Sequence, residues 1–93
     1  MDVYRFRLFI ASGTPNSAQV LANLNALCDA RLSGSHEIEV IDVFTEPTRA
    51  LEENIFMTPT LLKLLPAPEL RIVGTLADTR RVLQALGLEA LQE

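Results

Sequence analysis

The sequence predicts a small α/β fold in which strands and helices alternate and a β-hairpin precedes the last helix. Residues 3–10 alternate apolar and basic side chains, which is typical of a strand with one buried face. Residues 15–32 place apolar side chains at helical spacing. Residues 60–73 hold two short apolar runs separated by Pro-Ala-Pro-Glu, which indicates a hairpin. The predicted order is strand, helix, strand, helix, strand, strand, helix.

The first half of the chain is predicted to be a strand–helix–strand unit. Phe9 interrupts the polar face of the first strand, which indicates a central strand covered on both sides at that point. Thr14 is a suitable N-cap for the helix, and Pro15 fits its first position, where no N–H is needed. The helix should end at residues 33–35 and bury one apolar stripe, made of Val20, Leu21, Leu24, Leu27 and Cys28. Residues 37–44 form a second strand, buried on both sides in its second half, and a right-handed parallel crossover follows.

The second half adds a short helix, the hairpin and a last helix. The short helix starts near Pro47 and is expected to turn three apolar residues inward, namely Ala50, Leu51 and Ile55. The hairpin strands are residues 60–65 and 70–73. Asp78 is the expected N-cap of the last helix and Gly87 its C-terminal stop, with an inward face of Val82, Leu83 and Leu86.

The segment Thr58-Pro59-Thr60 predicts that the third strand is entered through a cis X–Pro bond at Pro59. A thioredoxin-like domain places such a loop beside the start of its first helix, and the predicted order of elements is thioredoxin-like. The redox dithiol expected at that helix start is missing. The single cysteine, Cys28, falls in mid-helix on the apolar stripe, where a buried thiol acts as a small core residue.

Composition limits the remaining possibilities. The chain has 93 residues and a net charge of −4, so we expect one domain over residues 1–93 and no nucleic-acid partner. No apolar run reaches the length of a membrane span, and the amino terminus does not have the pattern of a signal peptide, so the expected location is cytoplasmic. One Cys and one His do not supply a thiolate- or imidazole-rich metal site.

The titratable residues form no catalytic constellation that the sequence reveals. His36 lies beside glutamates with no catalytic partner, and the lone carboxylate of Asp42 is expected to cap a turn. We therefore predict neither enzymatic activity nor a cofactor. A binding module is the favoured class, because an extended partner segment can add to exposed backbone at the loop before the third strand.

Several sequence blocks together resemble the KaiB family, the small component of the cyanobacterial-type circadian clock. The resemblance covers nearly the whole chain. It is carried by Phe-Ile-Ala at 9–11, Thr-Pro-Asn-Ser at 14–17, Ile-Asp-Val at 41–43, Thr-Pro-Thr-Leu at 58–61, Lys63 with Leu65-Pro66, and Arg-Ile-Val-Gly at 71–74.

The resemblance implies a non-enzymatic adaptor that works by protein contact. KaiB-type proteins bind the ring-shaped ATPase KaiC, sequester KaiA and switch between two folds, a tetramer with its own topology and a thioredoxin-like monomer. The element order predicted above corresponds to the monomeric form, with the tetrameric topology as the alternative. The residues expected to contact a KaiC-type ATPase are Thr58, Pro59, Thr60, Lys63 and Arg71.

Departures from the family pattern sharpen these expectations. Where the family usually has Gly-Asp-Leu-Ser, this chain has Gly74, Thr75, Leu76 and Ala77, so residues Gly74, Thr75 and Asp78 are the fold-switch candidates. Since Asp78 supplies a cap for the last helix, we predict that the thioredoxin-like form dominates. Three family cations are replaced by Gln19, Ala22 and Asn54, which weakens attraction to an acidic partner such as a KaiA-like protein and suggests a divergent paralogue.

Two other functions remain open from the sequence. One is a free-standing version of the KaiB-related sensor module of SasA-type histidine kinases, which also binds KaiC. The other is a thioredoxin-type oxidoreductase, which would need a reactive thiol where this chain has Thr14.

Overall fold

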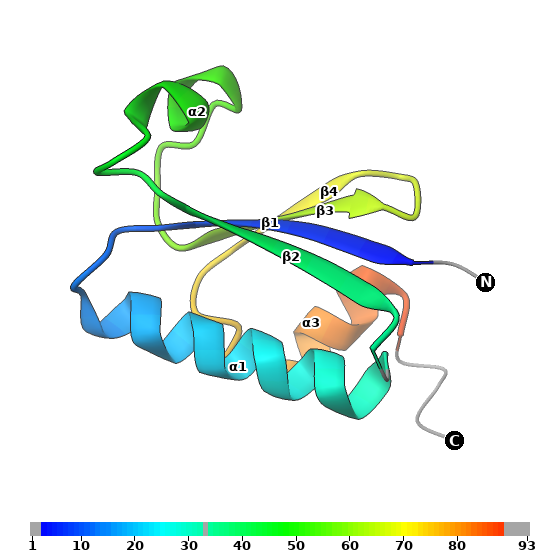
Figure 1. Ribbon diagram of the computed structural model, residues 1–93. Helices are drawn as coiled ribbons and strands as arrows, with labels where there is room; N and C mark the ends of the chain where they lie inside the picture. The colour runs from blue at the N-terminus through cyan, green and yellow to red at the C-terminus, as the bar shows by residue number, and fades with distance from the viewer. Residues whose placement is uncertain (1–2, 33, 89–93) are drawn as a thin grey trace.

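Four strands form one mixed sheet in the order β2-β1-β3-β4 in a computed structural model that describes residues 3–32 and 34–88 (Figure 1). β1 pairs in parallel with β2 and antiparallel with β3, and β4 is the antiparallel partner of β3. The elements in chain order are β1 Tyr4–Ile10, α1 Pro15–Arg31, β2 His36–Asp42, α2 Pro47–Glu52, β3 Thr60–Leu65, β4 Leu70–Val73 and α3 Thr79–Leu86. This order confirms the predicted thioredoxin-like arrangement, with the parallel crossover first and the hairpin later.

The two faces of the sheet are covered unequally. Helices α1 and α3 lie on one face, and the short α2 lies over one end of the other (Figure 1). The larger core joins Phe6 and Leu8 of β1 to buried residues of both long helices. A smaller core on the α2 side contains Phe9, Ile41, Ala50, Ile55 and Leu62. Phe9 is fully buried there, which confirms that β1 is covered on both faces near its end.

Both long helices begin and end where their local sequence places them. The Thr14 side chain accepts a hydrogen bond from the Ser17 N–H at 3.3 Å, and Pro15 occupies the first helical position. In α3 the Asp78 carboxylate accepts from the Arg81 N–H at 3.2 Å. Gly87 closes α3 in the left-handed conformation, with a φ of 75° that favours glycine. α1 ends at Arg31 with Leu32 as its C-cap, and Ser33 of the predicted stop lies outside the described residues.

The prediction for the second strand was wrong in two respects. β2 ends at Asp42 instead of residue 44, because the Asp42 carboxylate accepts the Phe44 N–H at 3.0 Å and starts a turn. The second half of β2 is not buried on both sides, since β2 is an edge strand and Val40 is 43% exposed. The expectation that Asp42 caps a turn is confirmed.

The prediction that Leu51 faces inward was also wrong. It assumed a helix continuing to Ile55, in which residues four apart share a face. The helix instead ends at Glu52, and Asn54 adopts a positive φ of 57° that redirects the chain. Ala50 and Ile55 are buried as expected, whereas Leu51 is 69% exposed.

Removing the cap of α3 should destabilise the fold. Asp78→Ala is expected to lower the free energy of unfolding by about 1 kcal/mol, because the Arg81 N–H loses its acceptor. Asp78→Ser keeps a capping oxygen and should retain most of the stability. Urea denaturation of the three proteins measures the difference. Equal stability of the alanine variant and the wild type would show that the cap contributes nothing.

Candidate protein-docking surface

The loop before β3 has the cis-proline that the sequence predicts, at the Thr58–Pro59 bond. Several of its polar groups have partners within the chain. The Thr60 hydroxyl donates to the Met57 carbonyl at 2.6 Å, and the Pro59 carbonyl accepts from the Gly74 N–H at 2.9 Å. Pro59 and Thr60 are buried, and Thr58 is half-buried. Thr58 is therefore the member of this trio that offers side-chain surface to a partner.

Lys63 lies in the middle of β3, between Phe6 of β1 and Leu70 of β4. Its side chain is 4% exposed and makes no hydrogen bond or ion pair with any residue in the ranges 3–32 and 34–88. Its neighbours on both sides are apolar, so the stem of Lys63 contributes packing. The side chain offers little surface to a partner in this form.

Arg71 of β4 holds the C-terminal end of α2. Its guanidinium donates to the Asn54 carbonyl at 2.9 Å and to the Glu53 carbonyl at 2.7 Å. Arg7 of β1 pairs with the Glu53 side chain at 2.5 Å from the same side of the sheet. Two arginines on separate strands thus fix the point at which α2 turns toward β3, and Arg71 acts in this form as a positioning residue.

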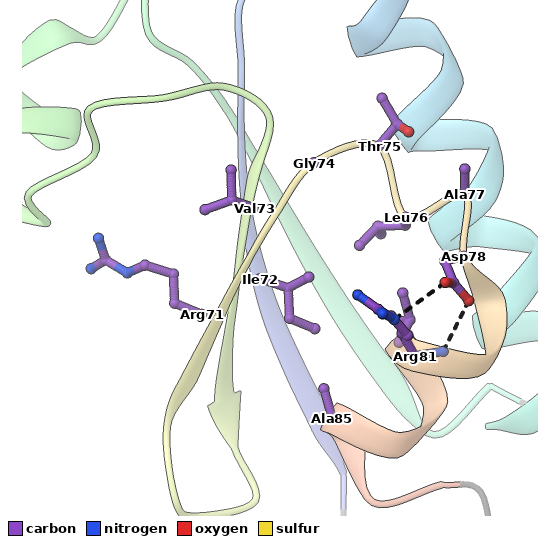
Figure 2. A pocket seen from close by; sticks show the side chains of 11 residues that line it. Arg71, Ile72, Val73, Gly74, Thr75, Leu76, Ala77, Asp78, Arg81 and Ala85 are labelled. Carbon is purple, nitrogen blue, oxygen red and sulfur yellow. Dashed lines mark hydrogen bonds and ion pairs between the residues drawn. The ribbon is translucent and has the colours of Figure 1, made fainter.

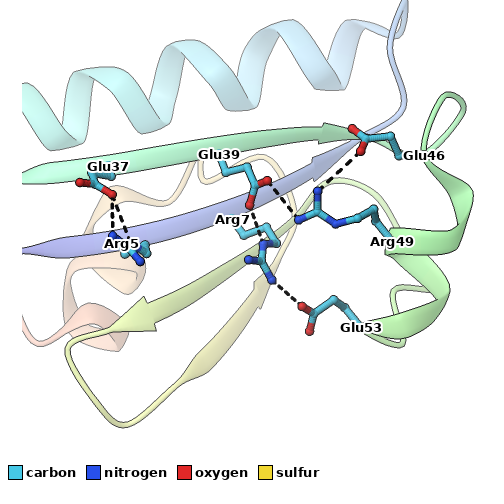
Figure 3. A network of polar contacts seen from close by, with 7 residues as sticks. All are labelled: Arg5, Arg7, Glu37, Glu39, Glu46, Arg49 and Glu53. Carbon is cyan, nitrogen blue, oxygen red and sulfur yellow. Dashed lines mark hydrogen bonds and ion pairs between the residues drawn. The ribbon is translucent and has the colours of Figure 1, made fainter.

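Charged pairs lie on the face of the sheet that α2 covers only at one end (Figure 3). Arg7 donates to Glu39 at 2.8 Å, and Arg49 of α2 reaches the same carboxylate at 3.1 Å. The hydrogen bond from Arg7 has the larger effect and that from Arg49 the next, and both hold the pKa of Glu39 below its usual value. The lowered pKa means that the folded state favours the charged form of Glu39. The stability that these bonds contribute is therefore present above the pKa that Glu39 has in the unfolded chain. It is lost as the pH falls through the lower pKa that Glu39 has in the folded chain.

The four most exposed large apolar side chains in the described part of the chain belong to α2 and its flanking segments. They are Phe44, Leu51, Phe56 and Met57, between 64% and 83% exposed, and we call them the α2 apolar surface. Other large apolar side chains that protrude reach at most 51%. Exposed apolar groups gathered in one segment are typical of a protein-docking site, because solvent exposure of such groups is otherwise unfavourable.

The start of α1 carries no reactive thiol. The Thr14 hydroxyl donates to the Ala11 carbonyl at 2.7 Å besides capping the helix. Cys28 is fully buried in mid-helix, and burial raises the pKa of its thiol to about 11, with a smaller contribution from Asp29.

The carboxylate of Asp42 forms a turn. Hydrogen bonding from Ser12, followed by that from the Phe44 N–H, lowers the pKa of Asp42, which fits this role. Residues 3–32 and 34–88 contain no cluster of three or more metal-ligating side chains.

The three fold-switch candidates lie between β4 and α3. Gly74 has a φ of 118°, which favours glycine, and the Thr75 carbonyl accepts from the Asn23 side chain at 2.8 Å. Asp78 caps α3 as described above. The three residues join the edge of the sheet to the last helix and to α1, and the exchange between two folds remains a prediction.

Comparison with known proteins identifies the family. Residues 7–88 match the family model described as the KaiB domain. The chain is 42% identical to a Synechocystis sp. protein, "Circadian clock protein KaiB3". The match covers 100% of this chain and 91% of that protein. The chain belongs to the KaiB family.

Solved structures place the KaiB-family chain among thioredoxin-like folds. The N-terminal domain of Synechococcus elongatus SasA superposes with a TM-score of 0.79 at 19% identity, covering 100% of this chain and 88% of that one. Chloroplastic thioredoxin z superposes with a TM-score of 0.76 at 21% identity, covering 96% of this chain and 80% of that one. At such identities the likeness concerns the fold alone.

Sequence reasoning on this KaiB-family chain found the cis-proline loop and missed the α2 apolar surface. Phe44 was assigned to a strand and Leu51 to the core, and Phe56 was not singled out. The sequence does offer a signal for this surface. Residues 44–57 contain more large apolar side chains than one short helix can bury. None of the helices among the described residues has the length and apolar character needed to cross a membrane.

Cys28 should resist alkylation in the folded protein. A pKa of about 11 leaves about one thiol in a hundred ionised at pH 9, where a free thiol is about half ionised. Iodoacetamide should therefore react much more slowly with the native chain than with the chain in urea. Equal rates in the two states, followed by mass spectrometry, would contradict the buried position.

Loss of Arg71 should loosen the end of α2. In Arg71→Ala the carbonyls of Glu53 and Asn54 lose their donors, so we expect about 1 kcal/mol less stability and faster exchange of the Ile55 amide. The stability of Arg71→Lys should lie between those of the wild type and Arg71→Ala, because an ammonium cannot reproduce the forked geometry of the guanidinium. Arg80→Ala, an exposed change on α3, is the control. An unchanged Ile55 exchange rate in Arg71→Ala would rule out the positioning role.

Proposed function

We propose that this chain is a non-enzymatic KaiB-type clock adaptor that docks on a KaiC-type ATPase. The observation that carries the proposal is the α2 apolar surface, which lies next to the cis-proline loop in a chain that belongs to the KaiB family. The curated relatives it matches are named circadian clock proteins. The proposal includes a part in rhythmic or stress-timing regulation, and the family membership supports it.

The physical basis of the docking is burial of apolar surface. Phe56 is 83% exposed, and covering such side chains on a partner is favourable by about 25 cal/mol per Å² of apolar area removed from water. Large aromatic and methionine side chains are also enriched at the centres of protein interfaces. Thr58 would lie at the rim of this contact. Pro59, Thr60, Lys63 and Arg71 would shape it from beneath, since they are buried or bound within the chain.

The proposal includes the form and place in which the adaptor acts. The thioredoxin-like fold would be the binding-competent form, monomeric in solution and cytoplasmic, with the tetrameric topology of the family as its alternative state. A KaiA-like protein would bind weakly at most, because the cations of the family pattern are replaced at three positions. A free-standing SasA-type sensor module is the second candidate, favoured by the superposition on the SasA domain.

Size-exclusion titration with the host's KaiC-type ATPase tests the proposal. The wild-type chain should co-elute with the ATPase in the presence of ATP. Phe56→Ser combined with Met57→Ser should weaken the complex by roughly tenfold or more, since central apolar contacts dominate interface energies.

The matched control for this titration is Val40→Ser, which removes an exposed apolar side chain from β2, outside the α2 apolar surface. It should bind as the wild type does. The proposal fails if no complex forms at high concentration. The docking surface is misplaced if the Val40 variant loses affinity while the double variant keeps it.

A further inference from the structure

Met57 and Cys28 are the sulfur-containing side chains of the described ranges, and they differ sharply in their access to solvent. The chain has two methionines and one cysteine, and Met1 lies outside the described residues. Met57 is 64% exposed, whereas Cys28 is fully buried. Burial also raises the pKa of the Cys28 thiol to about 11, so little thiolate is present to react with an oxidant. A dissolved oxidant therefore reaches the sulfur of Met57 before that of Cys28.

Hydrogen bonds tie the segment that carries Met57 to the sheet, in contrast to the groove of about 580 Å³ between β4 and α3 on the far side of β4 (Figure 2). The Met57 carbonyl accepts from the hydroxyl of Thr60, the buried first residue of β3, at 2.6 Å. Two residues after Met57, the Pro59 carbonyl accepts from the Gly74 N–H at 2.9 Å. The place of Met57 at the surface thus follows from the fold.

A peroxide converts an exposed thioether into a sulfoxide. The sulfur atom gives an electron pair to one oxygen of hydrogen peroxide, the O–O bond breaks, and an S=O bond forms. The other oxygen leaves as water, which takes up both hydrogens of the peroxide, so the sulfur is oxidised and the peroxide is reduced. The product has a polar oxygen where the side chain was apolar.

We propose that Met57 is an oxidation site, at which a peroxide-class oxidant weakens docking through the α2 apolar surface. The inference rests on the proposed function, because it concerns the regulation of the same surface. Met57 follows Phe56, the most exposed member of that surface. A partner that covers both residues would bury the sulfoxide oxygen in an apolar contact, and burying a polar group without a hydrogen-bond partner is unfavourable.

Docking and oxidation should oppose each other at this site. A partner that covers Met57 keeps the peroxide away from its sulfur, so oxidation should be slower in the complex than in the free chain. A chain that is free when the oxidant appears is modified and then binds weakly. The oxidant therefore acts on the undocked population of the protein.

Peptide mass mapping of the chain alone tests the modification site. Hydrogen peroxide should add one oxygen to Met57 in the native chain at a rate close to that in urea, because the sulfur is already accessible. Cys28 should react readily only in urea. Oxidation of Met57 that is much slower in the native chain than in urea would overturn the assignment of the site.

Size-exclusion titration with the host's KaiC-type ATPase and ATP tests the effect on docking. The chain is treated with peroxide, and catalase removes the peroxide before the ATPase is added. Oxidation should weaken binding of the wild type by at least roughly fivefold, since polar groups are poorly accommodated at the apolar centre of an interface. Methionine sulfoxide reductases supplied with a dithiol should restore the binding.

Two variants identify the residue that responds. Met57→Leu lacks the thioether, so peroxide should leave its affinity unchanged, whatever that affinity is. This variant retains Met1 and thereby controls for oxidation at residue 1. Cys28→Ala should lose affinity on oxidation as the wild type does.

The outcomes separate this inference from the proposed function. Equal affinity of the oxidised and the untreated wild type would overturn the inference and leave the docking proposal in place. An equal loss of affinity in Met57→Leu would assign the effect to another residue and would also overturn it. If the untreated wild type forms no complex, the proposed function fails and this regulation fails with it, whereas the mass mapping still decides whether Met57 is an oxidation site.

Discussion

The central position of β1 is the constraint on which the rest of the structure depends. β1 pairs on both sides and is buried on both faces near its end, with Phe6 and Leu8 toward α1 and α3 and Phe9 toward α2. Two helices, α1 and α3, cover the face that carries Phe6 and Leu8. The second face is covered only by a six-residue helix, so the apolar residues flanking it cannot all be buried. The α2 apolar surface consists of the apolar side chains of this segment that do not join the core around Phe9.

The scaffold has a thioredoxin-like fold, and the start of its first helix carries no thiol. The cis-proline loop and the start of α1 are both present, yet the position of the dithiol is taken by a threonine that caps the helix. The one thiol, Cys28, is buried, and burial raises its pKa to about 11, which lowers the fraction of thiolate that redox exchange requires. What remains is a four-stranded sheet with an exposed apolar segment beside it, and such a segment suits recognition of a partner protein.

Most of the fold could be predicted from the sequence, because its signals are local. The caps at Thr14 and Asp78, the hairpin and the cis-proline each depend on a few neighbouring residues. The exposure of the second half of β2 and the orientation of Leu51 could not be predicted, since they depend on which strand lies at the edge and where a short helix stops. The resemblance predicts Lys63 and Arg71 as contact residues, but the burial of Lys63 and the bonds of Arg71 to α2 are tertiary effects that no local pattern reveals.

Hydrogen exchange of the chain alone and in mixture with a KaiC-type ATPase and ATP tests the central claim most directly. Docking through the α2 apolar surface predicts slower exchange over residues 44–58, with the outward face of α1 unchanged. Protection confined to α1, or no protection anywhere at saturating ATPase, would contradict the adaptor role proposed for this surface.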